Sequence, residues 1–413
     1  MQLTSSTAAA AAERGLRSPI GARLNRPAAA GLIALLGWLA FVLARWQTWA
    51  KGQIGYFILV GHVYSHPAQL APHIPLVPSK GYDGQFYYRF AVNPFNWQRT
   101  AYGITADYPY RYTRLGYPLV TWVLSAGQHW LVPFMLVAVN LAAVTAMGVL
   151  GAVIARDSGR HALWGLLFVA YFGLVISIGR DTSEPVADAC MLAGLLAYRR
   201  SRYVLAAVAI AYAVVTNEPI LALAIAIAIT RLYAMSRRKA RPGTADLAWV
   251  LPAAAYAVLQ GLEKILVNGK SGGASDVSQN FSYPFGAMVR GVYEDVARAS
   301  WTHLGLYDIN LLEFVTLAAF VVAGFLVLRR TTAPAHERVA FVLFVLGEMV
   351  LASSQFWGSV FGDGRTYIDA YLLAVIMLLG TPPKYLPARY LRVLAAIAVP
   401  ALIVVARRRI LFE

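Results

Sequence analysis

Three carboxylates follow one another at helical spacing in the segment Arg180–Asp188. Asp181, Glu184 and Asp188 are three and four residues apart, so a helix would carry them on one face. Pro185 suits the first turn of that helix, where its missing N–H costs nothing. Asp181 and Glu184 could serve only as helix caps, favoured by the helix dipole, but Asp188 would then lie deeper in an apolar segment. Buried carboxylates of this kind generally line a cavity, and they can accept a proton from a hydroxyl group.

Charged residues also occur in three other, well-separated segments. Asp83 lies in the long polar stretch after the first apolar run, and Glu218 stands in an Asn-Glu-Pro turn. Asp363 and Arg365 share a Gly-Asp-Gly-Arg turn. A tight turn that leaves Glu218 in water is an equally acceptable interpretation of the second segment.

Several arginines near these carboxylates are candidates for holding a phosphate group, because a guanidinium group offers it two parallel donors. The candidates are Arg89, Arg111, Arg114, Arg180 and Arg365. A cavity with both acidic and basic side chains suits a phosphate-bearing substrate and a hydroxyl group that must lose a proton. A divalent metal is compatible with the carboxylates, but no spacing requires one, and no cofactor is required.

These residues must be positioned by membrane helices. The chain of 413 residues is 59% hydrophobic and 14% charged, whereas soluble domains carry about 25% charged residues. Apolar runs recur from Ala28 onward, and their backbone groups must be paired internally as helices. Since a crossing helix needs about 20 residues, we predict an all-α integral membrane protein with about eleven transmembrane helices. They are expected at 28–44, 131–155, 161–178, 183–198, 203–217, 219–235, 245–267, 309–328, 338–355, 367–381 and 388–406.

The composition also bears on other classes of protein. The net charge of +16 does not indicate nucleic-acid binding, because the basic residues lie in short links between apolar runs rather than in a stripe. They are better suited to contact membrane lipids. Cys190 is the only cysteine, so an intrachain disulfide and a cysteine metal site are excluded.

The orientation follows from the basic links, which are expected on the cytoplasmic side. The links at 198–203, 231–241 and 329–338 agree with a cytoplasmic N-terminus if residues 112–127 form an interfacial helix rather than a crossing one. This orientation places the basic segment Arg407–Arg409 on the outer side, against the expectation for basic residues.

This orientation gives a simple domain organisation. Residues 1–27 are predicted to be a disordered cytoplasmic tail, and residues 28–413 a single transmembrane domain. Its external loops are 45–130, with interfacial helices, and 268–308. Asp83, the Arg180–Asp188 segment, Glu218 and Arg365 all come to the outer side.

One pair of segments carries a family resemblance. Gly81–Ala91 has the sequence Gly-Tyr-Asp-Gly-Gln-Phe-Tyr-Tyr-Arg-Phe-Ala, and Tyr110–Pro118 the sequence Tyr-Arg-Tyr-Thr-Arg-Leu-Gly-Tyr-Pro. Together they resemble a signature of bacterial multi-pass proteins associated with cell-surface glycopolymer formation. That family is similar to the GT-C superfamily of polyprenyl-phosphate-sugar-dependent glycosyltransferases. The resemblance implies a GT-C-like bundle with a long first external loop containing juxtamembrane helices and an acid, here Asp83. The superfamily's second acidic position, which follows an arginine, corresponds to Asp181 here.

The resemblance implies sugar transfer from a polyprenyl-phosphate donor to a cell-surface glycan or lipid acceptor. The reaction would occur on the outer face of the bacterial plasma (inner) membrane, with inversion at the anomeric carbon. Asp83, or Asp181 as second choice, would take the acceptor's hydroxyl proton. Tyr87 and Tyr88 would stack on sugar rings, although such aromatics more often anchor a helix at the interface.

Two alternatives remain open from the sequence. A flippase or transporter for a lipid-linked glycan would use charged residues along helices equally well, but the internal repeats typical of transporters are not evident. A non-catalytic subunit of a glycopolymer assembly complex would keep the fold without the chemistry. Its Ala- and Gly-rich helices would pack against envelope-assembly partners.

Overall fold

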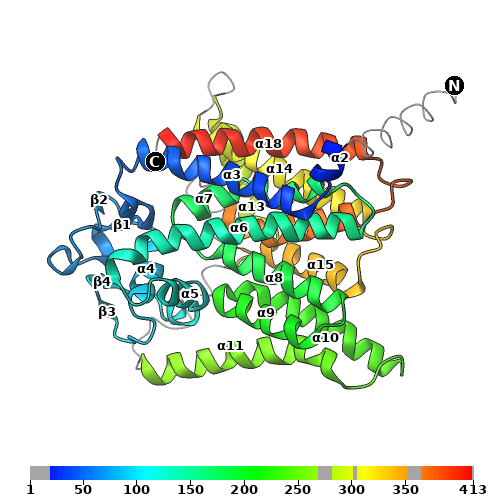
Figure 1. Ribbon diagram of the computed structural model, residues 1–413, viewed down its shortest axis with the longest axis horizontal. Helices are drawn as coiled ribbons and strands as arrows, with labels where there is room; N and C mark the ends of the chain where they lie inside the picture. Colours follow the sequence, from blue (N-terminus) through cyan, green and yellow to red (C-terminus); the bar gives the residue numbers. More distant parts are fainter. Residues whose placement is uncertain (1–18, 268–280, 301–304, 352–356, 358–363, 412–413) are drawn as a thin grey trace.

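The computed structural model describes residues 19–267, 281–300, 305–351, 357 and 364–411. It confirms the all-α prediction: helices dominate, and the described strands form two two-stranded sheets of two residues per strand. Most long helices run along the molecule, so that it has two distinct ends (Figure 1). Within the predicted N-terminal tail, α2 (Pro19–Leu24) is a short helix, whereas residues 1–18 lie outside the described part.

Six helices of the described residues are long and apolar enough to cross a membrane, and a seventh span results if one bent pair is counted as a single crossing. The six spans are α3 (Pro27–Gln47), His129–Asp157 with α6 (Val132–Asp157), Glu218–Ser236 with α10 (Leu221–Ser236), Thr244–Leu266 with α11 (Leu247–Leu266), α14 (Leu306–Val327) and α18 (Ala388–Leu411). The bent pair, η6 (Ala162–Val169) and α7 (Gly173–Gly179), meets at 64°.

Four other predicted spans are helices, but shorter than the roughly 20 residues that a crossing requires. They are α8 (Glu184–Arg199), α9 (Tyr203–Thr216), α15 (Ala335–Met349) and α17 (Ile368–Leu379). The predicted number of about eleven crossing helices is therefore not confirmed. An apolar run predicts burial, but it does not say whether lipid or protein surrounds the helix.

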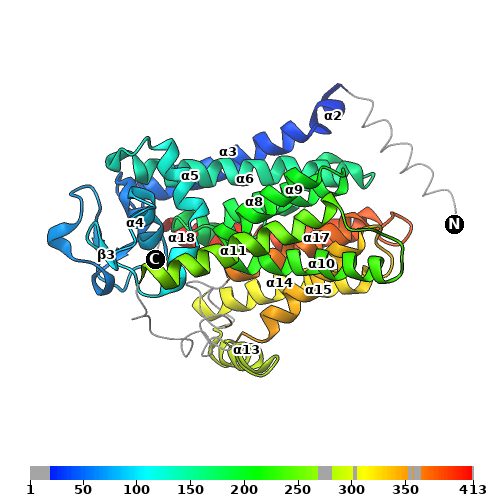
Figure 2. The same cartoon turned by 90° about the horizontal axis from the view of Figure 1, so that it is seen from below.

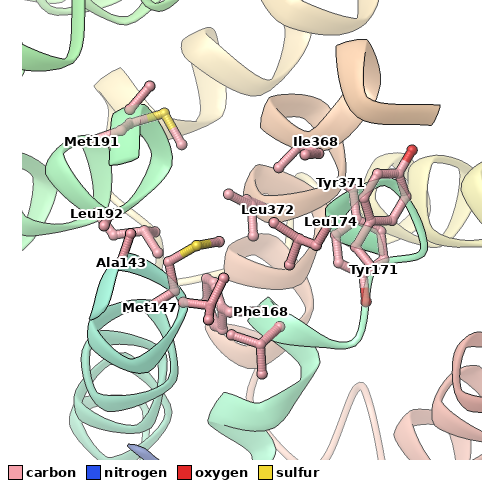
Figure 3. Close-up of a cluster of buried hydrophobic side chains, with 14 of the residues drawn as sticks. Ala143, Met147, Phe168, Tyr171, Leu174, Met191, Leu192, Ile368, Tyr371 and Leu372 are labelled. Atoms are coloured by element: carbon pink, nitrogen blue, oxygen red, sulfur yellow. The ribbon is translucent and has the colours of Figure 1, made fainter. Parts of the chain in front are cut away.

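The helix α17 shows this ambiguity most clearly, because all of its residues are buried. Figure 3 shows Ile368, Tyr371 and Leu372 of α17 among apolar side chains from α6, η6, α7 and α8. The ring of Tyr371 stacks on Tyr171 with 4.5 Å between centroids. This helix therefore forms the centre of the bundle, and protein rather than lipid covers it on every side.

The segment between α3 and α6 gathers at one end of the molecule (Figures 1 and 2). Its helices are α4 (Gly84–Val92) and α5 (Gly116–Leu124), and its strands pair as β1 (Val60–Gly61) with β2 (Leu76–Val77) and β3 (Thr100–Ala101) with β4 (Ile104–Thr105). With nine residues, α5 is too short to cross a bilayer. The 3-10 helices of this segment are η1 (Ile54–Ile58), η2 (His62–Tyr64), η3 (Pro67–Gln69), η4 (Pro109–Thr113) and η5 (His129–Leu131).

The basic links lie at the opposite end, where polar contacts join them. Arg160 donates to the carbonyl oxygens of Thr381 (2.6 Å) and Leu386 (2.9 Å). Arg199 at the end of α8 forms a bidentate pair with the buried Glu337 at the start of α15. Charge counting predicted this separation from loop 45–130.

The remaining short elements are η7 (Glu218–Ile220), η8 (Thr244–Asp246), η9 (Gly364–Tyr367) and α13 (Gly286–Arg298), which packs against α14.

The C-terminal end of helix α18 is held by the end of α3, which lies beside it (Figure 1). Arg45 is fully buried and donates to the carbonyl oxygens of Gly179 (3.2 Å) and Arg409. Thr48 donates to the carbonyl of Ile410 at 2.7 Å. Because the last carbonyls of a helix lack intrahelical partners, a buried arginine and a hydroxyl group stabilise this terminus.

Replacing Arg45 with Met should lower the thermal unfolding midpoint of the purified protein and expose α18 to protease. Each hydrogen bond to a charged group contributes about 1.5–3 kcal/mol, and the variant loses two of them while leaving carbonyls buried. The matched control is Arg407→Met, because Arg407 is exposed. Equal midpoints for the two variants would contradict the role of Arg45.

Candidate functional site

The site begins at α4, whose first turn lies directly against the Arg180 segment. A Cβ atom on Gly84 would lie 2.3 Å from the carbonyl oxygen of Arg180, so only glycine permits this approach. Asp83 occupies the N-cap position of α4, yet its carboxylate makes no capping hydrogen bond to the helix. The carboxylate is turned toward arginines instead.

Arg111 of η4 is the first of these arginines. Its Nη2 donates to Oδ1 of Asp83 at 2.8 Å, and its Nε donates to Oδ1 of Asp107 at 2.9 Å. The guanidinium group lies over the ring of Phe86, 4.4 Å from its centroid. Its Nη1 is buried, and no group of the described residues accepts a hydrogen bond from it. Arg111 is therefore a fixed cation with one donor group to spare.

Arg365 of η9 reaches Asp83 from the other end of the sequence. Its Nη2 donates to Oδ2 of Asp83 at 2.5 Å, its Nη1 pairs with Glu184, and its Nε donates to the Tyr82 hydroxyl at 2.9 Å. The position of η9 depends on a close approach of two glycines. A Cβ atom on Gly173 would lie 2.4 Å from the carbonyl oxygen of Gly364.

Arg114 and Glu218 form a second, bidentate pair beside the first. Nε and Nη2 of Arg114 each donate to a carboxylate oxygen of Glu218 at 2.6 Å. The ring of Tyr110 links the two pairs, since the guanidinium carbons of Arg111 and Arg114 lie 4.8 and 4.9 Å from its centroid. Burial raises the pKa of Tyr110 to about 12, so its hydroxyl stays neutral.

We call this group the charged cluster. Its members are Asp83, Asp107, Arg111, Arg114, Arg180, Glu184, Glu218 and Arg365, four carboxylates and four guanidinium groups. Arg180 belongs to it through Tyr82, because its guanidinium carbon lies 4.2 Å from the centre of that ring. The side chains of Asp83, Arg111 and Arg365 are 15, 6 and 12% exposed, so their ion pairs are largely shielded from solvent.

The electrostatics of Asp83 follow from this geometry. Burial by itself would raise the pKa of its carboxyl group, but the guanidinium groups of Arg111 and Arg365 outweigh burial and hold that pKa well below its usual range. Asp83 is therefore ionised across the physiological range. While both arginines remain in place it is a weak base.

The structure thus brings together most of the predicted site residues from four distant segments, and it places others elsewhere. Arg89 donates to the carbonyl of Gln98 and lies over the Phe90 ring, 4.4 Å from its centroid, so it holds the loop after α4. Tyr88 is buried in the apolar core. These two residues do not join the charged cluster. Tyr87 lies beside it, and its hydroxyl shares a 2.8 Å hydrogen bond with Ser183.

The prediction that three carboxylates share one helical face is wrong for Asp181. The helix α8 begins at Glu184, and Asp181 precedes it with a left-handed φ of 48°. Glu184 and Asp188 do share a face, one turn apart. Asp181 is fully buried, no group of the described residues donates to its two carboxylate oxygens, and Arg45 is the cation that acts on it. Such strain and a buried carboxyl group without a donor are costly, and such features occur often at functional positions. Asp363 lies outside the described residues.

Sequence reasoning left Asp107 and Thr182 out of the site. Asp107 stands four residues before Arg111 and orients it, and Thr182 donates to Glu184. The i, i+4 spacing of Asp107 and Arg111 was a usable signal, whereas Thr182 offered none.

Among the described residues, no group of three or more His, Cys, Asp or Glu side chains is arranged to hold a metal ion. Comparisons of the chain with protein-family models, curated proteins and solved structures find no match.

Substituting Ala for Gly84 should disturb the site measurably. The added methyl group would overlap the Arg180 carbonyl and push α4 away, and overpacking of this kind costs about 1–3 kcal/mol. We expect a lower thermal unfolding midpoint. Gly37→Ala is the control, because a Cβ atom there would meet no atom of the described residues within 4 Å. If Gly84→Ala were as stable as Gly37→Ala, the close approach would not be needed.

Proposed function

We propose that the protein is a membrane glycosyltransferase that transfers a sugar from a polyprenyl-phosphate donor to a glycan or lipid acceptor. The observation that carries the proposal is the pairing of Asp83 with both Arg111 and Arg365 at one end of an apolar bundle. A lipid-linked substrate needs such a place, because its polyprenyl chain stays in the membrane while its phosphate needs cations beyond the hydrocarbon.

The donor phosphate would be held by the arginines. The buried Nη1 of Arg111 offers an unused N–H group, and arginine suits bidentate phosphate binding. A phosphate oxygen that forms an ion pair with Arg111 or Arg365 would separate that cation from Asp83. Holding the phosphate also stabilises it as a leaving group when the bond to the anomeric carbon breaks.

The same displacement would activate the base. A general base works best when its pKa is near the working pH, and Asp83 loses basicity to the two arginines. Once the phosphate has drawn an arginine away, Asp83 can accept the acceptor's hydroxyl proton as the oxygen attacks the anomeric carbon. The sugar transfers with inversion, and the donor leaves as polyprenyl phosphate. Asp181 remains the second candidate for the base.

A flippase for a lipid-linked glycan is the second candidate function. The break of 64° between η6 and α7 favours it, because transporters place substrate sites at discontinuous helices. Such a protein would move the lipid-linked glycan between leaflets without cleaving the bond between sugar and phosphate.

Activity is testable with the purified protein in lipid vesicles, a radiolabelled polyprenyl-phosphate hexose and native membranes that supply the acceptor. We expect label to enter the acceptor fraction while polyprenyl phosphate is released. Asp83→Asn should lower this rate by a factor of about 100 or more, the usual contribution of a general base. Asp157→Asn is the control, because Asp157 is half-exposed in a weak ion pair with Arg200.

Full turnover by Asp83→Asn and Asp181→Asn alike would refute both base assignments. Transfer of intact labelled lipid between leaflets, with no release of polyprenyl phosphate, would support the flippase.

We further propose that the charged cluster faces the outside of a bacterial plasma membrane. In a Cys190→Ala background, a cysteine at the exposed Lys80 should react with an impermeant maleimide on intact cells. Lys239 is exposed in the link between α10 and α11, which lies at the opposite end of the molecule (Figure 1), and Lys239→Cys should react only after permeabilisation. The reverse pattern would invert the orientation, and labelling of both in intact cells would contradict the placement of these positions at opposite ends.

A further inference from the structure

Behind the charged cluster lies a pair of carboxyl groups that the proposed transfer reaction does not use. Asp188 of α8 and Asp369 of α17 are buried, with 1 and 4% of their surfaces exposed. Asp369 acts electrostatically on Asp188, and the helices α8 and α17 that carry them pack against each other. No N–H or O–H group of the described residues donates to Oδ2 of Asp188 or Oδ1 of Asp369. Two buried carboxyl groups on packed helices, without such donors, favour a form in which at least one of them is protonated.

The described residues around the pair carry further carboxyl groups. Glu348 of α15 is 5% exposed, and Asp369 acts on it electrostatically. The hydroxyl of Tyr171 is buried without a hydrogen-bond partner among the described residues, and Glu348 and Glu313 act on it electrostatically. In the described part of the chain, no lysine or arginine is within salt-bridge distance of Asp188, Asp369 or Glu348. Burial of adjacent carboxylates favours a retained proton.

Glu184 connects this pair to the charged cluster. It precedes Asp188 by one helical turn and acts electrostatically on both Asp188 and Asp369. Arg365 neutralises Glu184 through their ion pair, while Thr182 and Ser177 donate hydrogen bonds to it. The charge that the pair experiences therefore depends on where Arg365 is.

We propose that Asp188 and Asp369 form a proton-binding site whose occupancy is set by the ion pair between Arg365 and Glu184. While Arg365 neutralises Glu184, the pair holds one proton. When Arg365 is drawn away, the uncompensated charge of Glu184 favours binding of a second proton from solvent. This compensates the charge of an anion that enters a cluster of four carboxylates and four guanidinium groups. The last step rests on the proposed function, because it needs an anionic substrate.

The proton site can be measured without any substrate. Infrared spectra of the protein in lipid, recorded as the pH is varied, report the carbonyl stretch of protonated carboxyl groups. We expect Arg365→Gln to raise the midpoint of this band by about one pH unit or more, because Glu184 loses its counter-ion. Glu184→Gln should lower the midpoint, because a like charge is removed. Asp369→Asn should abolish the titration of the pair.

The opposite directions separate this mechanism from general loosening of the fold, which would move both variants in the same direction. Equal midpoints in the wild type, Arg365→Gln and Glu184→Gln would overturn the coupling. An unchanged band in Asp369→Asn would overturn the site itself. If Arg365→Gln does not fold, the direction of the Glu184→Gln shift decides whether the ion pair and the proton site are coupled.

A second measurement adds the substrate step, with farnesyl phosphate as the probe. Calorimetry in two buffers of different ionisation enthalpy should show proton uptake on binding, and Asp369→Asn should lose that uptake while still binding. Binding without uptake in the wild type would refute the coupling to substrate and leave the proposed function standing. Absence of binding would count against the proposed function, whereas the infrared shifts would still decide the proton site.

Discussion

The ion pairs of Arg365 are the constraint on which the site depends. One guanidinium group holds Asp83, 282 residues earlier in the chain, and Glu184, 181 residues earlier. Removing one partner from a buried ion pair leaves an uncompensated charge and costs several kcal/mol, about 3–5 in measured cases. The ends of α4, α8 and α17 must therefore meet at one point. Glycines allow it, since Gly84 and Gly173 sit where a side chain would collide with backbone.

The balance of charges in the cluster explains both its stability and its reactivity. With each carboxylate set against a guanidinium group, the closed site is stable without substrate, and Asp83 is a weak base in that state. A phosphate group changes the balance because it competes for the same donors. Substrate binding and activation of the base would therefore be one event. The phosphate that pairs with an arginine also separates that arginine from the Asp83 carboxylate. The proton on Asp188 and Asp369 would let a buried region accept this extra charge at low cost.

The bundle keeps two sets of charges apart. At the end opposite the charged cluster, Arg160 and the pair Arg199–Glu337 join loops and helix ends. These contacts lie among basic links, as charge counting predicted. Between the two ends α17 is enclosed by protein, which allows a helix of twelve residues in a membrane protein. Lipid thickness constrains only helices that face lipid.

The sequence by itself determined the helical class, the positions of the helices and which segments share an end, because apolar length and basic links are local properties. It also pointed to Asp83, Arg111 and Arg365 through residue type. It could not determine which helices cross the membrane, since lipid and protein select the same apolar side chains. Nor could it separate Arg111 from Arg89, or place Asp181 before α8 rather than on its face. Those outcomes depend on close backbone approaches and on pairing between distant charges, which only the tertiary structure decides.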